Sequence, residues 1–435
     1  MSPAIRQVAG PLAVLVSLAS GALVPAQVHK GLETFDAVWT IVRDSHFDPA
    51  LNGVDWGAVR EELRPGAASA TTDGELRSVI REMLGRLGQS HFALVPSTAD
   101  TPLESGDTSG DPGFDVRLIG REVIVISTDR GGSAAAAGVR PGWRLTAIDA
   151  RLVSSMLDAL PDGMADRLLH VEGWRIVTSR LRGPRGSSVP LTFEDGSGRE
   201  MRVQVQRRAE QGEPATVGHM PTMFVQVESG TRRTPAGAAV GLVRFNVWMP
   251  AVDARFAEAI DRFRALPGIV LDLRGNPGGL AAMIMGISGH FLTERKPLGV
   301  MKTRDSELRF FSNPRLVNAA GQRVKPFGGR LAILMDGMSG SASECFAGGL
   351  QSLGRARVFG QTSMGQALPA LFDLLPNGDV FIHAYGDFVT ATGVRLEGRG
   401  VIPDEAVPLR RADLLAGRDV TLERALAWID RQDGG

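Results

Sequence analysis

The sequence predicts an α/β protein of several domains, whose largest domain holds a parallel or mixed sheet. Apolar runs at 240–245, 269–273 and 331–335 are typical of strands buried on both faces. Between the first two runs, apolar residues at 252, 256, 260 and 263 indicate an amphipathic helix. Strands that alternate with helices favour a sheet covered on both faces. With 435 residues, the chain is long enough for two or three domains with their own cores.

Charge and cysteine content narrow the possible partners. The chain has 48 basic and 48 acidic residues, so we expect neither nucleic acid nor a charged membrane surface as a partner. Its one cysteine, Cys345, excludes an intrachain disulfide and a cysteine-based metal cluster, and we expect it to be a buried packing residue. The histidines are scattered without ligand spacing, so no metal and no cofactor are predicted.

The first residues are typical of a secretory signal peptide. Arg6 precedes an apolar run over 8–24, and small residues stand before a cut after Ala26. We therefore expect residues 1–26 to be removed from an exported, periplasmic or secreted protein that has no membrane contact after cleavage. An uncleaved membrane anchor is the alternative, since the positive charge before the run is thin.

Residues 30–98 read as an N-terminal helical domain. Apolar residues recur at three-to-four spacing over 35–42 and 76–87, and Thr72 or Asp73 can cap the later helix. That helix is expected to end at Gly88, directly before Gln89-Ser90-His91. A lone histidine at a helix end is more often a partner of the helix dipole than a catalytic group.

The stretch from 331 to 344 offers a nucleophile. Its buried strand runs into Asp336-Gly337, and Ser339, Ser341 and Ser343 follow where a helix over 344–353 is predicted to begin. A serine at such a junction has its hydroxyl at the open end of the sheet, beside an N–H of the helix N-terminus.

A second loop follows the strand at 269–273. Glycines at 275, 278 and 279 permit positive φ, so this loop can present backbone N–H groups to a developing negative charge. A glycine turn without a ligand is an equally good reading of the loop alone. A phosphate loop is disfavoured, because no Gly-Lys-Ser/Thr follows.

Five motifs in order carry a family resemblance. They are Asp272-Leu-Arg-Gly-Asn-Pro-Gly-Gly279, Ser341-Ala-Ser-Glu344, Ala347-Gly-Gly-Leu-Gln351, Gly360-Gln-Thr362 and Gly400-Val-Ile-Pro-Asp404. Together they resemble the tail-specific, or C-terminal processing, serine peptidases and their tricorn-type relatives. The resemblance implies an α/β catalytic domain of crotonase/ClpP-like type over 216–410, which a C-terminal helix over 418–432 follows.

The resemblance also implies the roles of the site residues. Ser341 matches the nucleophile, whereas Ser339 and Ser343 are expected to serve the turn and the helix start. The C-terminal processing branch activates its serine with a lysine, but Gln366 stands at that position and no lysine follows Lys325.

The tricorn-type branch supplies a base without lysine. By that resemblance His91 is the base, Glu397 supports it and Ser90 helps, which satisfies the need of a hydroxyl nucleophile for an oriented base. The alternative interpretation of Glu397 is a charged residue on a surface loop without a catalytic role. The oxyanion hole is expected from the N–H of Gly278 or Gly279 together with that of Ala342.

Residues 105–210 resemble a PDZ domain. The segments 123–127, 132–142 and 145–148 match the PDZ core, and alternating residues over 189–193 and 201–205 predict a closing hairpin around Asp195-Gly196. PDZ domains capture a chain terminus as an added strand, so a substrate C-terminus is one expected partner. Asp115, however, would lie near that carboxylate, and a structural or gating role is the alternative. The segment 156–185 has no assigned purpose.

The sequence therefore predicts a serine endopeptidase that acts on peptides or unfolded proteins. The alternative is a member without activity that binds a peptide or another ligand, as retinoid-binding relatives do. Loss of the lysine fits the alternative, whereas joint retention of Ser341, His91 and Glu397 fits the enzyme. An α/β-hydrolase esterase fits less well, because its Gly-x-Ser-x-Gly elbow fails after Ser339. Cleavage preference and oligomeric state are not predicted.

Overall fold

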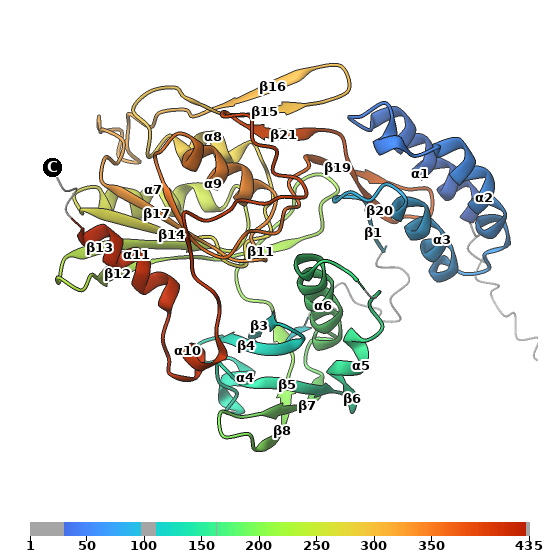
Figure 1. Ribbon diagram of the computed structural model, residues 1–435, viewed down its shortest axis with the longest axis horizontal. Helices are drawn as coiled ribbons and strands as arrows, with labels where there is room; N and C mark the ends of the chain where they lie inside the picture. Colours follow the sequence, from blue (N-terminus) through green and yellow to red (C-terminus); the bar gives the residue numbers. More distant parts are fainter. Residues whose placement is uncertain (1–29, 97–109, 162, 432–435) are drawn as a thin grey trace, which may run out of the picture.

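The computed structural model describes residues 30–96, 110–161 and 163–431, so the proposed signal peptide at 1–26 lies outside the described residues. Figure 1 shows three regions: a large α/β part, the helices α1 to α3 beside it, and a lobe that holds β3 to β8 and α6.

The helical region contains α1 (Gly31–Ser45), the 3-10 turn η1 (Leu51–Gly53), α2 (Trp56–Ser69), α3 (Asp73–Gly85) and β1 (Ala93–Val95). The lobe and its edges contain β2 (Gly110–Asp111), β3 (Phe114–Ile119), β4 (Glu122–Thr128), α4 (Ser133–Ala136), β5 (Arg144–Ile148), β6 (Arg151–Leu152), α5 (Val153–Leu157), α6 (Asp166–Leu181), β7 (Ser188–Glu194), β8 (Glu200–Gln206) and β9 (Arg208–Ala209). The α/β part contains β10 (Glu213–Ala215), β11 (Met223–Val225), β12 (Val227–Arg233), β13 (Ala239–Phe245), α7 (Val252–Phe263), β14 (Gly268–Asp272), α8 (Met283–Ser288), β15 (Pro297–Lys302), β16 (Glu307–Phe311), β17 (Arg330–Met335), α9 (Ala342–Ser352), β18 (Arg357–Gly360), β19 (Ala370–Leu374), β20 (Val380–Ala384), β21 (Asp387–Thr390), β22 (Glu405–Ala406), α10 (Arg411–Leu415) and α11 (Val420–Asp430).

The largest sheet is mixed and has the strand order β12-β13-β14-β17-β18-β22. β12 pairs antiparallel with β13, and every later pair is parallel. The loops after β14 and β17 therefore leave the same edge of neighbouring strands, which is where open α/β sheets place their ligands. This arrangement brings the glycine loop and the Ser341 loop together.

Helices cover both faces of this sheet because successive side chains of a strand point to opposite faces. Leu331, Ile333 and Met335 of β17 pack with residues of α7, α8 and α9 on one face. Ala332 and Leu334 pack with Ala425 and other residues of α11 on the other face. The expected cover on both faces is confirmed.

The helical region shares its core with a distant hairpin. Leu375 and Phe381, from the β19–β20 hairpin, complete the apolar cluster of α1, α2 and α3. Arg77 of α3 forms a buried bidentate ion pair with Asp379 of the hairpin, with N–O distances of 2.8 and 2.7 Å. β1 pairs with β20 as well. The residues just before β1, among them His91, are therefore fixed to the α/β part.

The lobe is built on a sheet of order β3-β4-β5-β7-β8 with its own apolar cluster. The expected hairpin is present as β7 and β8, and Asp195 begins the turn between them. The segment 156–185, which had no assigned purpose, contains α6. Gly173 of α6 lies so close to β3 that a Cβ there would come within 2.7 Å of the Leu118 side chain.

Some expectations on element bounds are wrong. The apolar stretch 280–291 forms only the short helix α8, because the Leu280 N–H bonds the Trp248 carbonyl and keeps the first residues in the glycine loop. The helix predicted over 344–353 begins earlier, at Ala342. The PDZ-like and crotonase/ClpP-like assignments and the domain limits remain predictions. Within the described ranges, no helix is long and apolar enough to cross a membrane.

Candidate active site

Ser341 stands at the start of α9 in a strained backbone conformation. Its φ is 51° and its ψ is −117°, in a region that residues other than glycine rarely adopt. The Ser341 N–H bonds the Gln366 carbonyl oxygen at 2.9 Å and Glu344 Oε2 at 3.0 Å, which holds the turn in place. A serine on such a sharp strand-to-helix turn exposes its hydroxyl beside the helix N-terminus.

The glycine loop lies directly against this serine. A Cβ on Gly278 would come within 2.6 Å of Ser341 Cβ and 3.0 Å of the Ala342 nitrogen, so only glycine fits there. Gly278 has a φ of 108° and Gly279 a φ of 136°. A Cβ on Gly279 would come within 2.5 Å of the Trp248 carbonyl oxygen.

The expected oxyanion donors differ in their availability. The Gly278 N–H donates to Asn276 Oδ1 at 3.0 Å, so it is already engaged. Within the described part of the chain, the N–H groups of Gly279 and Ala342 have no backbone or side-chain acceptor. Of the alternatives that the sequence left open, Gly279 together with Ala342 is thus the pair free to bind an oxyanion.

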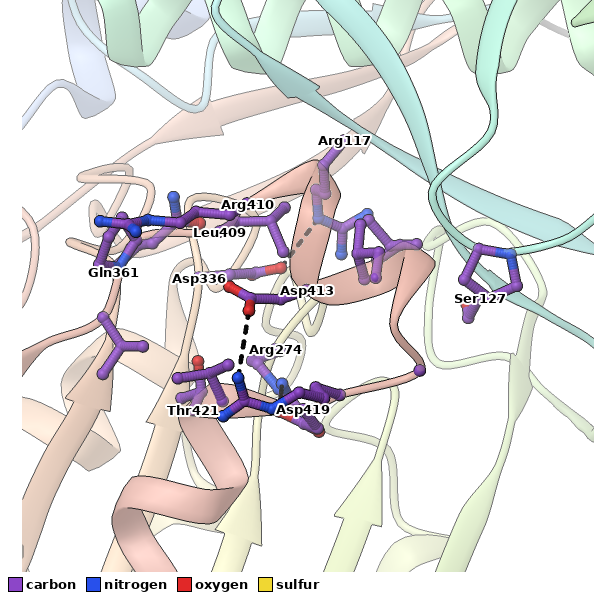
Figure 2. Close-up of a pocket in the computed structure, with 18 of the residues that line it drawn as sticks. Arg117, Ser127, Arg274, Asp336, Gln361, Leu409, Arg410, Asp413, Asp419 and Thr421 are labelled. Carbon is purple, nitrogen blue, oxygen red and sulfur yellow. Dashed lines mark hydrogen bonds and ion pairs between the residues drawn. The ribbon is translucent and has the colours of Figure 1, made fainter. Parts of the chain in front are cut away.

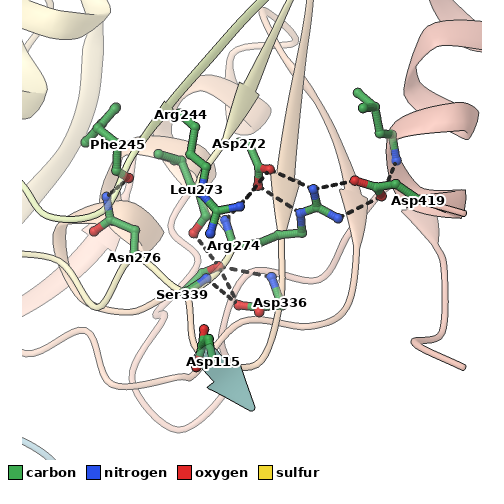
Figure 3. Close-up of polar contacts among 12 residues, drawn as sticks. Asp115, Arg244, Phe245, Asp272, Leu273, Arg274, Asn276, Asp336, Ser339 and Asp419 are labelled. Atoms are coloured by element: carbon green, nitrogen blue, oxygen red, sulfur yellow. Dashed lines mark hydrogen bonds and ion pairs between the residues drawn. The ribbon is translucent and has the colours of Figure 1, made fainter. Parts of the chain in front are cut away.

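Side chains fasten the two loops to each other (Figure 3). Asp336 Oδ1 accepts from the Gly275 N–H at 2.9 Å, and Ser339 Oγ donates to the Leu273 carbonyl at 2.9 Å. Ser343 Oγ donates to the Asn276 carbonyl at 3.1 Å. Ser339 thus serves the turn, as expected, and Ser343 links the helix start to the glycine loop.

Glu344 is a residue of the candidate site that had no predicted role. It is fully buried and accepts from Ser363 Oγ at 2.5 Å, the Gly365 N–H at 2.6 Å and the Gln366 N–H at 3.0 Å, besides the Ser341 N–H. Burial raises the pKa of Glu344 to about 7, and these hydrogen bonds act in the opposite direction. The three-residue spacing from Ser341 to Glu344, which is typical of a capping box, is the signal that could have found it.

Ser90, His91 and Glu397 form a hydrogen-bonded group. Ser90 Oγ lies 2.8 Å from His91 Nδ1 and donates to Glu397 Oε2 at 2.9 Å, while the Ser90 N–H donates to Glu397 Oε1 at 3.0 Å. The interpretation of Glu397 as a surface loop charge therefore fails, since both of its oxygens are engaged.

The carboxylate fixes the tautomer of His91. An ionised carboxylate can only accept, so the single Ser90 hydroxyl proton goes to Glu397. The Ser90 oxygen must then accept from His91 Nδ1–H, which leaves a lone pair on Nε2. Desolvation, and to a lesser extent the nearby Arg175 guanidinium, lower the pKa of His91 to about 4. At neutral pH the ring is uncharged and can accept a proton.

The segment 366–367 connects Ser341 to the hydrogen-bonded group of Ser90, His91 and Glu397. The Gln366 carbonyl accepts from the Ser341 N–H at 2.9 Å, and the next residue, Ala367, donates its N–H to Glu397 Oε2 at 2.9 Å. The hydrogen bonds of the described residues include none between Ser341 and His91. The structure thus assembles Ser341 with the glycine loop and His91 with Ser90 and Glu397, and connects the groups through 366–367.

The helix α6 of the lobe covers these loops. Arg175 donates to Gln366 Oε1 at 3.2 Å, and Arg167 donates to the Gly398 carbonyl at 2.6 Å, next to Glu397. Val171 packs with Met338 and Met364 in a small apolar cluster. A lone arginine on an exposed helix face gives no sequence signal, so this contact was not predicted.

A second Ser-His-Asp row occurs elsewhere in the structure. Ser45 Oγ lies 3.0 Å from His383 Nδ1, and His383 Nε2 lies 2.8 Å from Asp373 Oδ2. Ser45 sits in α1 and its hydroxyl donates to the Ile41 carbonyl at 2.7 Å, so it is not presented as a nucleophile. His383 is buried and fastens α1 to the β19–β20 hairpin, so its role is structural.

Comparisons with known proteins identify two domains of the chain. The model of peptidase family S41 matches residues 239–407, and the tricorn protease C1 domain matches residues 31–85. A carboxyl-terminal-processing protease of Picosynechococcus sp. is 26% identical over 386 residues, which are 85% of this chain and 81% of the relative. One of Synechocystis sp. is 24% identical over 401 residues, which are 89% of this chain and 84% of the relative.

A solved structure shares the fold. The photosystem II D1 C-terminal processing protease superposes with a TM-score of 0.58 at 21% identity, over 92% of this chain and 98% of that chain. Part of the chain that holds Ser341, the glycine loop and Glu397 is thus an S41 domain, and the helices before His91 form a tricorn C1 domain. With this S41 domain and its similarity to carboxyl-terminal-processing proteases, the chain is a serine-type peptidase.

Proposed function

We propose that this serine endopeptidase uses Ser341 as nucleophile and His91 as general base. Ser90 and Glu397 orient the imidazole, and the N–H groups of Gly279 and Ala342 bind the oxyanion. The observation that carries the proposal is the hydrogen-bonded Ser90–His91–Glu397 group, which leaves an unprotonated Nε2 at neutral pH. The missing lysine is then no loss, since the histidine supplies the base.

The reaction follows from these positions. Ser341 Oγ attacks the scissile carbonyl carbon while its proton passes to His91 Nε2, and the oxyanion forms at the Gly279 and Ala342 N–H groups. When the C–N bond breaks, His91 returns the proton to the leaving amine. Water then attacks the acyl ester and gives a proton to His91. His91 passes this proton to Ser341 Oγ as the C–O bond breaks, which releases the carboxylic acid and restores Ser341.

The contact between Ser341 and His91 is expected to form when substrate is bound. Catalytic hydrogen bonds are often long in free enzymes and shorten in the complex. Because 366–367 bonds Ser341 on one side and Glu397 on the other, a small shift of this segment moves both groups.

A fluorophosphonate that reacts with activated serines tests the proposal. We expect the wild-type chain to be labelled, and Ser341→Ala not. His91→Ala should label on the order of a thousandfold more slowly, as for the loss of other triad members. Ser45→Ala, in the second Ser-His-Asp row, is the matched control and should label as the wild type does. No labelling of a folded wild-type chain would favour the alternative, a family member that only binds peptides or other ligands.

The lobe that resembles a PDZ domain is proposed to meet the C-terminus of the substrate. β3 is an edge strand, so a peptide could pair with it. The close contact of Gly173 with Leu118 means that α6 must move away from β3 to admit the peptide. That movement would break the Arg175–Gln366 hydrogen bond, so binding of a C-terminus to the lobe would alter the segment 366–367 beside Ser341.

Export is proposed from residues 1–26 alone. The apolar run at 8–24 and the small residues before position 27 support removal of this segment. N-terminal sequencing of the protein isolated from its host tests this: a mature chain beginning at Gln27 is expected, and an intact Met1 would contradict it.

A further inference from the structure

A cavity of about 670 Å³ lies between the lobe, the main sheet and the C-terminal segment. Figure 2 shows Ser127 and Arg117 on the side of the lobe, Arg274, Asp336 and Gln361 at the end of the sheet, and 409–421 on the third side. Ligand pockets in proteins typically measure about 300–1,000 Å³. Ser341, His91 and Glu397 do not line this cavity.

Its lining carries an excess of positive charge. The charged lining residues are six arginines and three aspartates, namely Arg117, Arg140, Arg244, Arg274, Arg410 and Arg418 against Asp336, Asp413 and Asp419. Four of the arginines already have carboxylate partners: Arg117, Arg244, Arg274 and Arg418.

The remaining two arginines, Arg140 and Arg410, are available to bind a ligand. Among the residues that the structure describes, neither Arg140 nor Arg410 has an ion pair or a side-chain hydrogen bond. They come from different parts of the chain, Arg140 from the lobe and Arg410 from the residue before α10. A guanidinium offers a planar fork that matches a carboxylate.

The rest of the lining is largely apolar. Trp143 and Val407 are nearly buried, and Leu409 and Leu414 add apolar surface from the C-terminal segment. The segment is held in place, because Arg411 donates to the Gly142 carbonyl at 2.9 Å and to the Asp195 carbonyl at 2.9 Å. The cavity therefore has fixed walls, an apolar body and two unpaired cations.

We propose that this cavity binds a small carboxylate with an apolar body, held by Arg140 and Arg410. An apolar group fits the aliphatic and aromatic lining, and the negative charge complements the two arginines that have no carboxylate partner. A short peptide with a free C-terminus has this chemistry, and so does an aliphatic acid. The choice of a peptide as one probe rests on the proposed peptidase function.

The cavity and the active site share their walls. Arg274 begins the glycine loop, Asp336 begins the Ser341 loop, and Gln361 begins the segment that leads to 366–367. Asp336 also bonds the Gly275 N–H and pairs with Arg117 Nε of the lobe at 2.8 Å. A ligand in this cavity therefore contacts the first residues of the loops that hold Ser341 and Gly279, and the carboxylate is inferred to change the reactivity of Ser341.

Calorimetric titration of the full chain carrying Ser341→Ala tests the binding. The probes are an N-acetylated apolar tripeptide with a free carboxylate, the same tripeptide as its amide, and octanoate. We expect the acid to bind at least tenfold more tightly than the amide. The double variant R140Q/R410Q should weaken the acid at least tenfold, whereas R81Q/R424Q, which removes two exposed arginines elsewhere, should leave it unchanged.

The outcomes separate the possibilities. Arginine-dependent binding of octanoate supports a site for any apolar carboxylate, and binding of the tripeptide acid alone supports a peptide terminus. Equal affinity of acid and amide, or undiminished binding to R140Q/R410Q, overturns the proposal. If R140Q/R410Q does not fold, R140K/R410K keeps the charge but loses the fork, and the acid should still bind more weakly.

A second measurement tests the coupling. The rate at which the fluorophosphonate labels Ser341 should change at least twofold when the bound carboxylate saturates the wild-type chain, and not in R140Q/R410Q. An unchanged rate at saturation overturns the coupling. Because the titration needs no hydrolysis, failure of the peptidase proposal leaves the binding result unaffected.

Discussion

The charge state of His91 gives the sharpest test of the site. Its pKa is lowered from 6.5 to about 4, first by desolvation and then by the Arg175 guanidinium. At pH 5.5 a histidine with pKa 6.5 is about 90% protonated, whereas one with pKa 4 is about 3% protonated. The wild-type ring should therefore stay neutral throughout the range in which free histidine takes up its proton.

Arg175→Met removes one of the two causes. Without the positive charge the pKa of His91 should rise, and it should remain below 6.5 because desolvation persists. Arg180→Met, on the same helix but without a role in this shift, is the matched control and should change nothing.

Nuclear magnetic resonance of histidine-labelled protein measures this directly. The ring signal that disappears in His91→Gln is followed as pH falls from 8 towards 4 in wild type, Arg175→Met and Arg180→Met. Titration of the wild-type signal near 6.5, or the same midpoint in Arg175→Met as in wild type, would refute the account of His91 as a desolvated base beside an arginine.

Three further predictions concern buried groups. The Glu344 carboxylate accepts four hydrogen bonds, and in Glu344→Gln the amide NH2 would face some of these donors. We therefore expect kcat/KM to fall at least tenfold. A variant that keeps full activity would contradict the role given to Glu344. Among the described residues, neither ring nitrogen of the buried His290 has a hydrogen-bond partner, and desolvation lowers the pKa of His290 to about 4. As pH falls from 6.5 to 4, the unfolded chain takes up a proton at His290 that the folded chain does not, and the free energy of unfolding falls by about 3 kcal/mol. His290→Phe should therefore flatten the pH dependence of Tm in this range. An unaltered slope would contradict this account of His290. Asp379→Asn removes the bidentate carboxylate that pairs with the buried Arg77 guanidinium and should lower the unfolding free energy by about 3–5 kcal/mol in urea titration. A loss below about 1 kcal/mol would show that the pair is dispensable.

The main strands of the sheet were predictable because they are buried on both faces. The runs at 269–273 and 331–335 contain little besides apolar residues, and they form β14 and β17 within one residue of the expected bounds. β15, β16 and β21 were not foreseen. Their burial is partial and their sequences mix charged and apolar residues, so they carry no clear period.

The site was predictable to the extent that its residues lie in local motifs. Ser341, the glycine loop and Ser90-His91 each follow the end of a recognisable element, and the structure brings each to the edge of the sheet or its neighbourhood. What the sequence does not disclose is contact over long separations. The Ala367–Glu397 and Arg175–Gln366 hydrogen bonds join residues 30 and 191 positions apart, and no spacing rule reaches that far.

The exchange of lysine for Gln366 has a physical counterpart on α6. The Gln366 amide oxygen accepts from Arg175, so a neutral acceptor is needed where the C-terminal processing relatives are expected to hold a lysine. A lysine there would face the guanidinium as a like charge and would lose this hydrogen bond. The same arginine helps keep His91 unprotonated. One cation on the covering helix therefore disfavours a lysine at 366 and lowers the pKa of the imidazole at 91, so both effects have the same electrostatic cause.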